Sequence, residues 1–176
     1  MSIKKKGIGI FGGSFDPPHE AHLQLSIISL KKIGLKTIYW VITKKNPFKK
    51  RPFFSLHERI KKSKKVIKGS KKIKVIYLDK KVNSSRTIHI VNHFINKKNH
   101  KNLYLIVGSD TLLKFHKWKS WKKIVKLTKL VVFSRKGYDK KSKNSTVVKY
   151  LKKTNIIFIK NKFFNTSSSK IRKNLK

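Results

Sequence analysis

The chain has 176 residues, 38% of them hydrophobic and 11% aromatic, which fits a folded domain and excludes a disordered segment. It has no cysteine, which excludes disulfides and thiolate sites, and no apolar run near the roughly 18 residues of a membrane span. The formal net charge of +41 favours polyanions as partners, but the lysines are spread over every segment rather than forming one stripe.

Short apolar stretches rich in Ile, Val and aromatic residues predict six strands. They cover residues 8–11, 37–42, 73–78, 103–107, 130–133 and 156–159. A helix is expected over residues 20–33, with Leu23, Ile27 and Leu30 on one face and Gly34 as its stop. Strand and helix patterns thus begin to alternate at the start of the chain.

Further helices follow the later strands. Ser55 and Glu58 have the spacing of a capping box, which predicts a helix start. Ile88, Val91 and Ile95 recur at helical spacing and mark another helix. Ser120 can cap a short helix through residue 125, and residues 144–152 are a weaker helix candidate. The alternation predicts a Rossmann-like α/β fold, a single domain over residues 1–176 with a mostly parallel sheet flanked by helices. Such sheets bind ligands beyond the carboxyl ends of their strands.

The segment after the first strand, Gly12 to His22, carries the strongest chemical signal. Two glycines allow a ligand to approach the backbone closely, and His19 and His22, three residues apart, face the same way at a helix start. Imidazoles at the positive end of a helix are suited to hydrogen bonding with phosphate. A surface pair or half of a metal site is the alternative, but only Asp16 and Glu20 stand nearby as further ligands.

Two other nucleotide-binding patterns are excluded. The spaced glycines from Gly7 to Gly12 fall inside the first strand, and no acidic residue ends the second strand. A glycine-rich loop ending in Lys-Ser or Lys-Thr is also missing from the sequence, which argues against a P-loop enzyme.

The block from Gly12 to His22 resembles the signature of the nucleotidyltransferase superfamily, and within it the chain resembles bacterial nicotinate-nucleotide adenylyltransferases. Further matching blocks appear in the family's order over nearly the whole chain. They begin at Trp40, Ser85, Gly108, Trp118, Phe133 and Ser167.

The resemblance implies adenylyl transfer from ATP to nicotinate mononucleotide, giving nicotinate adenine dinucleotide and pyrophosphate in NAD biosynthesis. It implies His19, His22 and Arg172 as catalytic residues. It implies ATP contacts from these three residues and from Gly12, Gly13, Ser14, Phe15, Gly108, Asp110, Ser134, Arg135, Ser168 and Ser169. It implies acceptor contacts from Asp16, Lys49, Thr87, Trp118 and Lys119, with Trp118 stacked on the pyridine ring.

The sequence departs from the family pattern at three positions. Ala21 replaces a more usual glycine, Ser169 stands where threonine is usual, and His89 replaces an acidic residue. Asp79 is a candidate for the acidic residue expected before the Ser85 block. From the residues alone, Asp110 could instead cap a helix, and Trp118 could belong to the core, as we expect for Trp121.

We expect Mg²⁺ to arrive with ATP, no metal site of the protein's own, and a cytoplasmic location. Expected partners are the two small-molecule substrates, with no membrane and no specific nucleic acid; self-association stays open. The alternatives are a pantetheine-phosphate or nicotinamide-nucleotide adenylyltransferase and, from another class, a basic nucleic-acid-binding protein.

Overall fold

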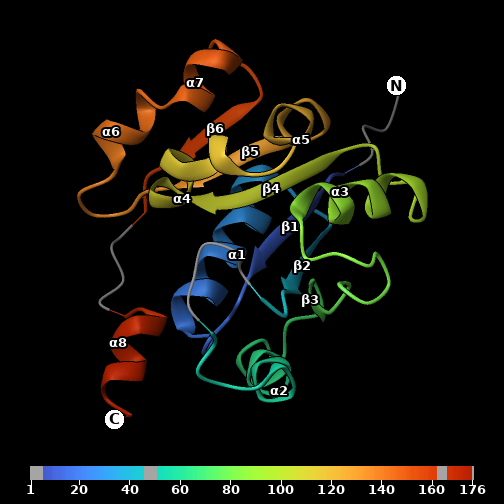
Figure 1. Cartoon of the computed structure of the whole chain (residues 1–176), viewed down its shortest axis with the longest axis vertical. Coiled ribbons are helices and arrows are strands. Elements are labelled where there is room, and N and C mark those ends of the chain that lie inside the picture. Colours follow the sequence, from blue (N-terminus) through green and yellow to red (C-terminus); the bar gives the residue numbers. More distant parts are fainter. Residues whose placement is uncertain (1–5, 46–50, 162–165, 176) are drawn as a thin grey trace.

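The computed structural model describes residues 6–45, 51–161 and 166–175. Six strands form one all-parallel sheet in the order β3-β2-β1-β4-β5-β6 (Figure 1). Their bounds are Ile8–Gly13 (β1), Thr37–Ile42 (β2), Ile73–Ile76 (β3), Leu103–Gly108 (β4), Lys129–Phe133 (β5) and Ile156–Ile159 (β6). The predicted α/β fold is confirmed, and the sheet is parallel throughout.

Among the described residues, helices and one 3₁₀ turn connect the six strands, and a last helix, α8, follows β6. Their bounds are Glu20–Ile33 (α1), Leu56–Val66 (α2), Thr87–Asn96 (α3), Ser109–Lys114 (α4), Phe115–Lys117 (η1), Trp121–Leu127 (α5), Asp139–Lys143 (α6), Thr146–Leu151 (α7) and Ser168–Lys173 (α8). Helix α1 ends at Gly34 with φ 69°, and the Ser55–Glu58 capping box begins α2, both as predicted.

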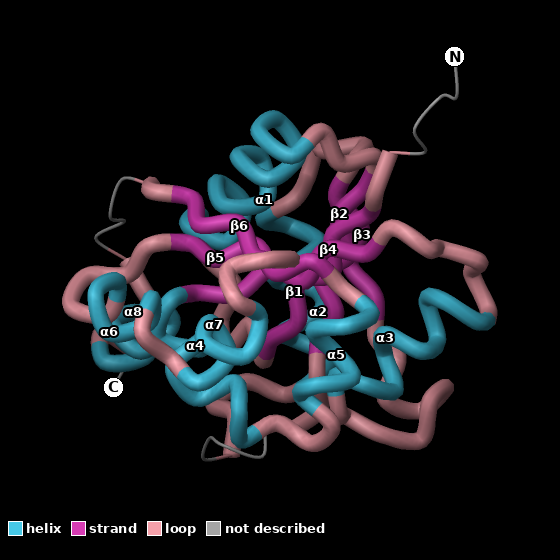
Figure 2. Tube along the Cα trace, turned by 90° about the horizontal axis from the view of Figure 1, so that it is seen from above, coloured by secondary structure: helices cyan, strands magenta, loops and turns pink. Residues whose placement is uncertain are grey.

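The sheet separates two apolar layers (Figure 2). On one face, α1 and α2 cover a cluster around Ile38, Trp40 and Ile106. On the other, α3, α4, α5 and α7 cover a cluster around Leu105 and Leu130. Because both faces are covered, the central strands read as continuous apolar runs rather than as alternating ones.

Several boundaries differ from the sequence prediction. β3 ends at Ile76 because the chain turns at Leu78, whose carbonyl accepts the N–H of Val82 at 2.9 Å. β1 instead runs on through Gly12 and Gly13, which pair with β2. Ser120 precedes α5 with φ 57° and makes no side-chain cap, so that detail of the prediction is wrong.

Two short helices were missed, α4 and α6, together with the η1 turn. At 3 to 6 residues each, they are too short to show a hydrophobic period. On α1, Leu23 and Leu30 join the apolar cluster as expected, but Ile27 does not, and the fully buried positions include Ser26 and Ser29.

Candidate active site

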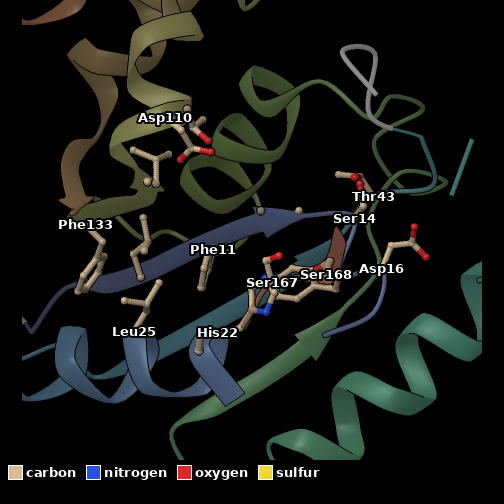
Figure 3. A pocket seen from close by; sticks show the side chains of 18 of the residues that line it. Phe11, Ser14, Asp16, His22, Leu25, Thr43, Asp110, Phe133, Ser167 and Ser168 are labelled. Carbon is tan, nitrogen blue, oxygen red and sulfur yellow. The ribbon is translucent and has the colours of Figure 1, made fainter. Parts of the chain in front are cut away.

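A cavity of about 1510 Å³ lies at the carboxyl ends of β1, β4 and β5. The strand order reverses between β1 and β4, since β2 and β3 continue to one side and β5 and β6 to the other. This is the position where open parallel sheets bind nucleotides. Figure 3 shows His22 and Leu25 pointing from α1 toward β1, with Asp110 on the other side of that strand in this view.

The cavity brings together the predicted site residues that the structure describes. They are Gly12, Gly13, Ser14, Phe15, Asp16, His19, His22, Thr87, Gly108, Asp110, Trp118, Lys119, Ser134, Arg135, Ser168, Ser169 and Arg172. Lys49 falls in 46–50, outside the described residues. Residues far apart in the chain thus line one space, and the role of each remains a prediction.

Two glycines of the wall differ in the space around them. A Cβ on Gly12 would meet no described atom within 4 Å, so this strand end is open to the cavity. A Cβ on Gly108 would lie 2.5 Å from Oδ1 of Asp110, so only glycine lets that carboxylate take its place. Gly108 precedes α4 and Asp110 lies in its first turn, so Asp110 is not the helix cap.

His19 and His22 form a close pair at the start of α1. Their ring centroids are 4.0 Å apart, and the backbone N–H of His19 donates to Nδ1 of His22 at 3.2 Å. Because Nδ1 of His22 accepts, a neutral His22 ring carries its proton on Nε2. Two imidazoles thus stand at the positive end of the 14-residue helix α1.

His19 is uncharged at neutral pH. Burial, and then the positive charge of Arg135, lower its pKa from 6.5 to about 4. Its Nδ1 is buried and finds no hydrogen-bond partner within the part of the chain that the structure describes. A buried atom of this kind on a cavity wall is a ready contact for a ligand.

Aromatic rings enclose His22 on its inner side. The ring of Phe15 lies 4.9 Å from that of His22 and stacks on Trp40 at 4.9 Å and 20°. Phe11 is 5.7 Å from both Phe15 and His22. Trp40 is fully buried, so these rings form a fixed platform for the imidazole.

Helix α8 attaches to the loop that precedes α1. The hydroxyl of Ser168 donates to the carbonyl of Pro17 at 2.8 Å, and Arg172 donates to the carbonyl of Asp16. Arg172 also lies 3.6 Å from the Asp16 carboxylate and donates to the hydroxyl of Ser169 at 3.2 Å. Serine hydroxyls and a guanidinium from the end of the chain therefore join the histidine wall.

The carboxylate of Asp16 acts on the protein itself. Its two oxygens accept the backbone N–H groups of Phe53 and Phe54, each at 2.9 Å, and the residue is buried. Asp16 thereby links the α8 side of the cavity to residues 51–54, where Phe53 lines the wall with 48% of its surface exposed.

Arg59 is a residue of the site region that sequence reasoning missed. Its side chain is buried beneath the cavity and donates to the carbonyls of Ser14 and Thr43 at 2.7 Å. It also reaches those of Phe54 and Lys44 at 3.2 Å. One guanidinium therefore fixes the loops after β1 and β2 to the start of α2. Its position in an amphipathic helix gives no signal, because a charged residue there is usually solvated.

Asp79 lies beside this region and does not line the cavity. Its Oδ2 accepts the N–H of Lys44 at 2.8 Å, and burial raises its pKa. It stabilises the turn after β2, so it supports the site without entering it.

The opposite side of the cavity carries the residues expected to meet the acceptor. Thr87 begins α3, so its backbone amide lies among the unpaired N–H groups of a helix start. Trp118 is half-buried and stacks on Phe115, with ring centroids 4.5 Å apart. Basic side chains surround the opening: Lys45, Arg51, Arg86, Lys117, Lys119 and Lys136. Their field attracts anionic ligands.

In residues 6–45, 51–161 and 166–175, no group of three His, Asp or Glu side chains is arranged to hold a metal ion. Among the same residues, no helix is long and apolar enough to cross a membrane.

Comparison with known proteins assigns the family. A family model described as cytidylyltransferase-like matches residues 10–174. A Pelagibacter ubique protein named "Probable nicotinate-nucleotide adenylyltransferase" is 45% identical over 173 residues, 98% of this chain and 96% of that protein. A Rhizobium etli protein of the same name is 35% identical over 74% of this chain and 68% of its own length.

Solved structures agree on the fold. Plasmodium falciparum nicotinic acid mononucleotide adenylyltransferase complexed with NaAD has a TM-score of 0.74 at 23% identity, covering 96% of this chain and 83% of that one. A structure described as a putative nicotinate-nucleotide adenylyltransferase from Vibrio parahaemolyticus has a TM-score of 0.67 at 17% identity, covering 97% and 86%. The chain belongs to the cytidylyltransferase-like family and, within it, to the nicotinate-nucleotide adenylyltransferases.

Proposed function

We propose that this chain transfers the AMP part of ATP to the phosphate of nicotinate mononucleotide. A bond forms between an acceptor phosphate oxygen and the α-phosphorus of ATP, and the bond from that phosphorus to the leaving pyrophosphate breaks. The products are nicotinate adenine dinucleotide and pyrophosphate. The observation that carries the proposal is one cavity shared by the His19–His22 pair, the serines of α8 and the Trp118 side of the wall.

The acceptor phosphate is already a nucleophile, so the reaction requires no nucleophile or strong base from the protein. The protein's task is to align two anions and to stabilise the charge that develops on the leaving group. His22 can donate from Nε2 while its Nδ1 is occupied by the N–H of His19. The Ser169 hydroxyl, which accepts from Arg172 and keeps its own proton, and the Arg172 guanidinium supply further donors to the same phosphates. The Ser168 hydroxyl donates to Pro17, so Ser168 would contribute its backbone N–H at the start of α8.

In the free enzyme, before ATP binds, His19 is a neutral hydrogen-bonding group. Its pKa of about 4 is set by burial and by Arg135 in the absence of substrate. The negative charge of a bound triphosphate beside the ring favours the protonated imidazole, so it counteracts the lowering of the pKa by burial and by Arg135. Binding of ATP is therefore expected to raise the pKa of His19.

We assign Asp110 and Gly108 to the ribose of ATP. One carboxylate oxygen of Asp110 pairs with Arg135, and the other, Oδ1, is buried with no hydrogen-bond partner among the described residues. A ribose hydroxyl is a donor of the size and kind that such an oxygen accepts. We assign the nicotinate carboxylate to backbone amides near Thr87 and Lys119, and the pyridine ring to Trp118.

We propose that Mg²⁺ enters as part of the substrate, coordinated by ATP phosphates and water. Phosphate oxygens are preferred ligands of this ion, which keeps several of its waters. We also propose the cytoplasm as the location, since ATP is available there.

The test is pyrophosphate release with ATP and Mg²⁺ and one of three acceptors: nicotinate mononucleotide, its amide, or phosphopantetheine. We expect at least about tenfold preference for the acid over the amide. The NH₂ group of the amide would face backbone amide donors, and the buried donors left without an acceptor would cost about 1–3 kcal/mol. Trp118→Ala should raise KM for the acceptor more than KM for ATP. Equal use of acid and amide would contradict the acceptor assignment, and release with phosphopantetheine alone would favour the alternative acceptor.

A further inference from the structure

A hydrogen-bonded pair of buried residues outside the cavity, Ser26 and Trp40, connects β2 to the first turn of α1. Ser26 and Trp40 each have 0% of their surface exposed, and neither lines the described cavity wall. The indole N–H of Trp40 donates to Oγ of Ser26 at 2.8 Å. The hydroxyl of Ser26 in turn donates to the backbone carbonyl of His22 at 2.9 Å.

The direction of this chain is fixed by chemistry. An indole nitrogen can only donate, so Ser26 must accept from Trp40, and its own proton is then directed to the carbonyl of His22. Consecutive hydrogen bonds in a dry environment strengthen one another. The first turn of a helix lacks partners for its amides and frays most easily, so an anchor at His22 acts where α1 is weakest.

Trp40 reaches His22 by a second route. Its ring stacks on Phe15 at 4.9 Å, and Phe15 contacts the imidazole of His22, also at 4.9 Å. Phe15 itself is 3% exposed. The backbone of His22 is thus held through Ser26, and its ring is held through Phe15. Trp40 contacts both of these residues.

We propose that Trp40 and Ser26 are positioning residues that fix His22 for phosphate contact. The proposal rests on the function given above, because it assumes that His22 acts on substrate. Displacing a catalytic group by about 1 Å can cost up to about 100-fold in rate, so an anchor that acts only through His22 has a measurable effect on kcat.

Helix α1 offers a matched control one turn further on. Ser29 is also fully buried, and its hydroxyl donates to the carbonyl of Leu25, four residues earlier, at 2.8 Å. Ser29→Ala therefore removes the same kind of side-chain bond from the same helix without touching His22. A general effect of losing a buried serine would appear equally in Ser26→Ala and Ser29→Ala.

The experiment compares kcat and KM of the two alanine variants with ATP and nicotinate mononucleotide. Ser26→Ala should lower kcat about tenfold with KM for either substrate within about twofold, while Ser29→Ala keeps kcat within about twofold. Ser26→Cys, which keeps a weak donor, should recover part of the loss. Trp40→Phe keeps a stacking ring and the Ser26 hydroxyl but removes the donor that orients this hydroxyl, so it should lower kcat by less than Ser26→Ala. The double variant should be no worse than Ser26→Ala alone.

Imidazole nitrogen NMR of the free proteins reports on His22 without any assay. The His22 signals should move or broaden in Ser26→Ala and Trp40→Phe and stay at wild-type positions in Ser29→Ala. If kcat and the His22 signals of Ser26→Ala and Trp40→Phe match those of Ser29→Ala, the positioning role is overturned. If the wild type releases no pyrophosphate with any acceptor, the proposed function fails instead, and the NMR comparison still decides the anchoring of His22.

Discussion

Asp110 and Arg135 form an ion pair of 2.8 Å in the wall of the cavity, between Oδ2 and Nη1. The guanidinium therefore neutralises the carboxylate that we assign to ribose and also lowers the pKa of His19 from a distance. One basic side chain thus acts on both the ribose end and the phosphate end of the nucleotide site.

Removing this charge should change the titration of His19. Arg135→Gln should raise the pKa of His19 above 4 but keep it below 6.5, because burial, the larger cause, remains. Arg135→Lys keeps the positive charge and serves as the control. The measurement is imidazole NMR of the free protein as a function of pH; an unchanged His19 titration in Arg135→Gln would refute the coupling.

Stability should depend on pH through the same histidine. The folded pKa of His19 is about 4 and the unfolded value 6.5, so the unfolded chain binds more protons between these limits. The free energy of unfolding should therefore fall as pH drops from 6.5 toward 4. In His19→Ala this part of the pH dependence should be lost. The measurement is the free energy of unfolding in urea, for variant and wild type at each pH. The difference between the two proteins removes the contribution of the other histidines, which both share.

His19→Ala and His22→Ala should each lower turnover by about 10²–10³, the usual cost of one lost transition-state donor. Folding should be retained, because both side chains lie on the cavity wall. Circular dichroism and single-turnover pyrophosphate release check the two parts of the claim. Near wild-type turnover in either variant would remove that residue from the catalytic set.

Arg59→Met should destabilise the protein by at least about 2 kcal/mol, because the part-buried carbonyls of Ser14 and Thr43 lose the donor that a buried side chain gives them. Lys61→Met on the same helix removes an exposed charge of similar length and should change stability by less than about 0.5 kcal/mol. Urea unfolding of the two variants gives the comparison. Equal effects would show that charge on α2, and not the carbonyl contacts, determines the loss.

Much of this fold was predictable from the sequence because the central strands are buried on both faces. The runs around Ile38 and Leu105 therefore carry no polar interruption. The glycine–histidine segment could also be found, since Gly12, His19 and His22 lie in one short stretch of sequence and their arrangement depends on local geometry. The Ser26–Trp40 bond and the Arg59 contacts could not, because each joins residues whose pairing depends on how α1 and α2 dock on the sheet.

The charge of +41 gives a separate prediction. If it serves only as a surface field, binding to duplex DNA should be weak, independent of sequence and steeply reduced by salt. Fluorescence anisotropy with two unrelated duplexes over a salt series measures this directly. Tight binding to one duplex at physiological salt would support the nucleic-acid alternative.

The attachment of α8 to Pro17 and Asp16 has a consequence for how an active molecule comes into being. The two sides of the phosphate wall come from residues 12–22 and 167–172, so the ribosome makes one of them early and the other late. A growing chain can therefore pair its strands before the residues that complete the nucleotide site have been synthesised. Proteolytic cleavage just before Ser167 would remove the same side of the site. The remaining protein would keep its sheet and stay in solution but would bind ATP weakly.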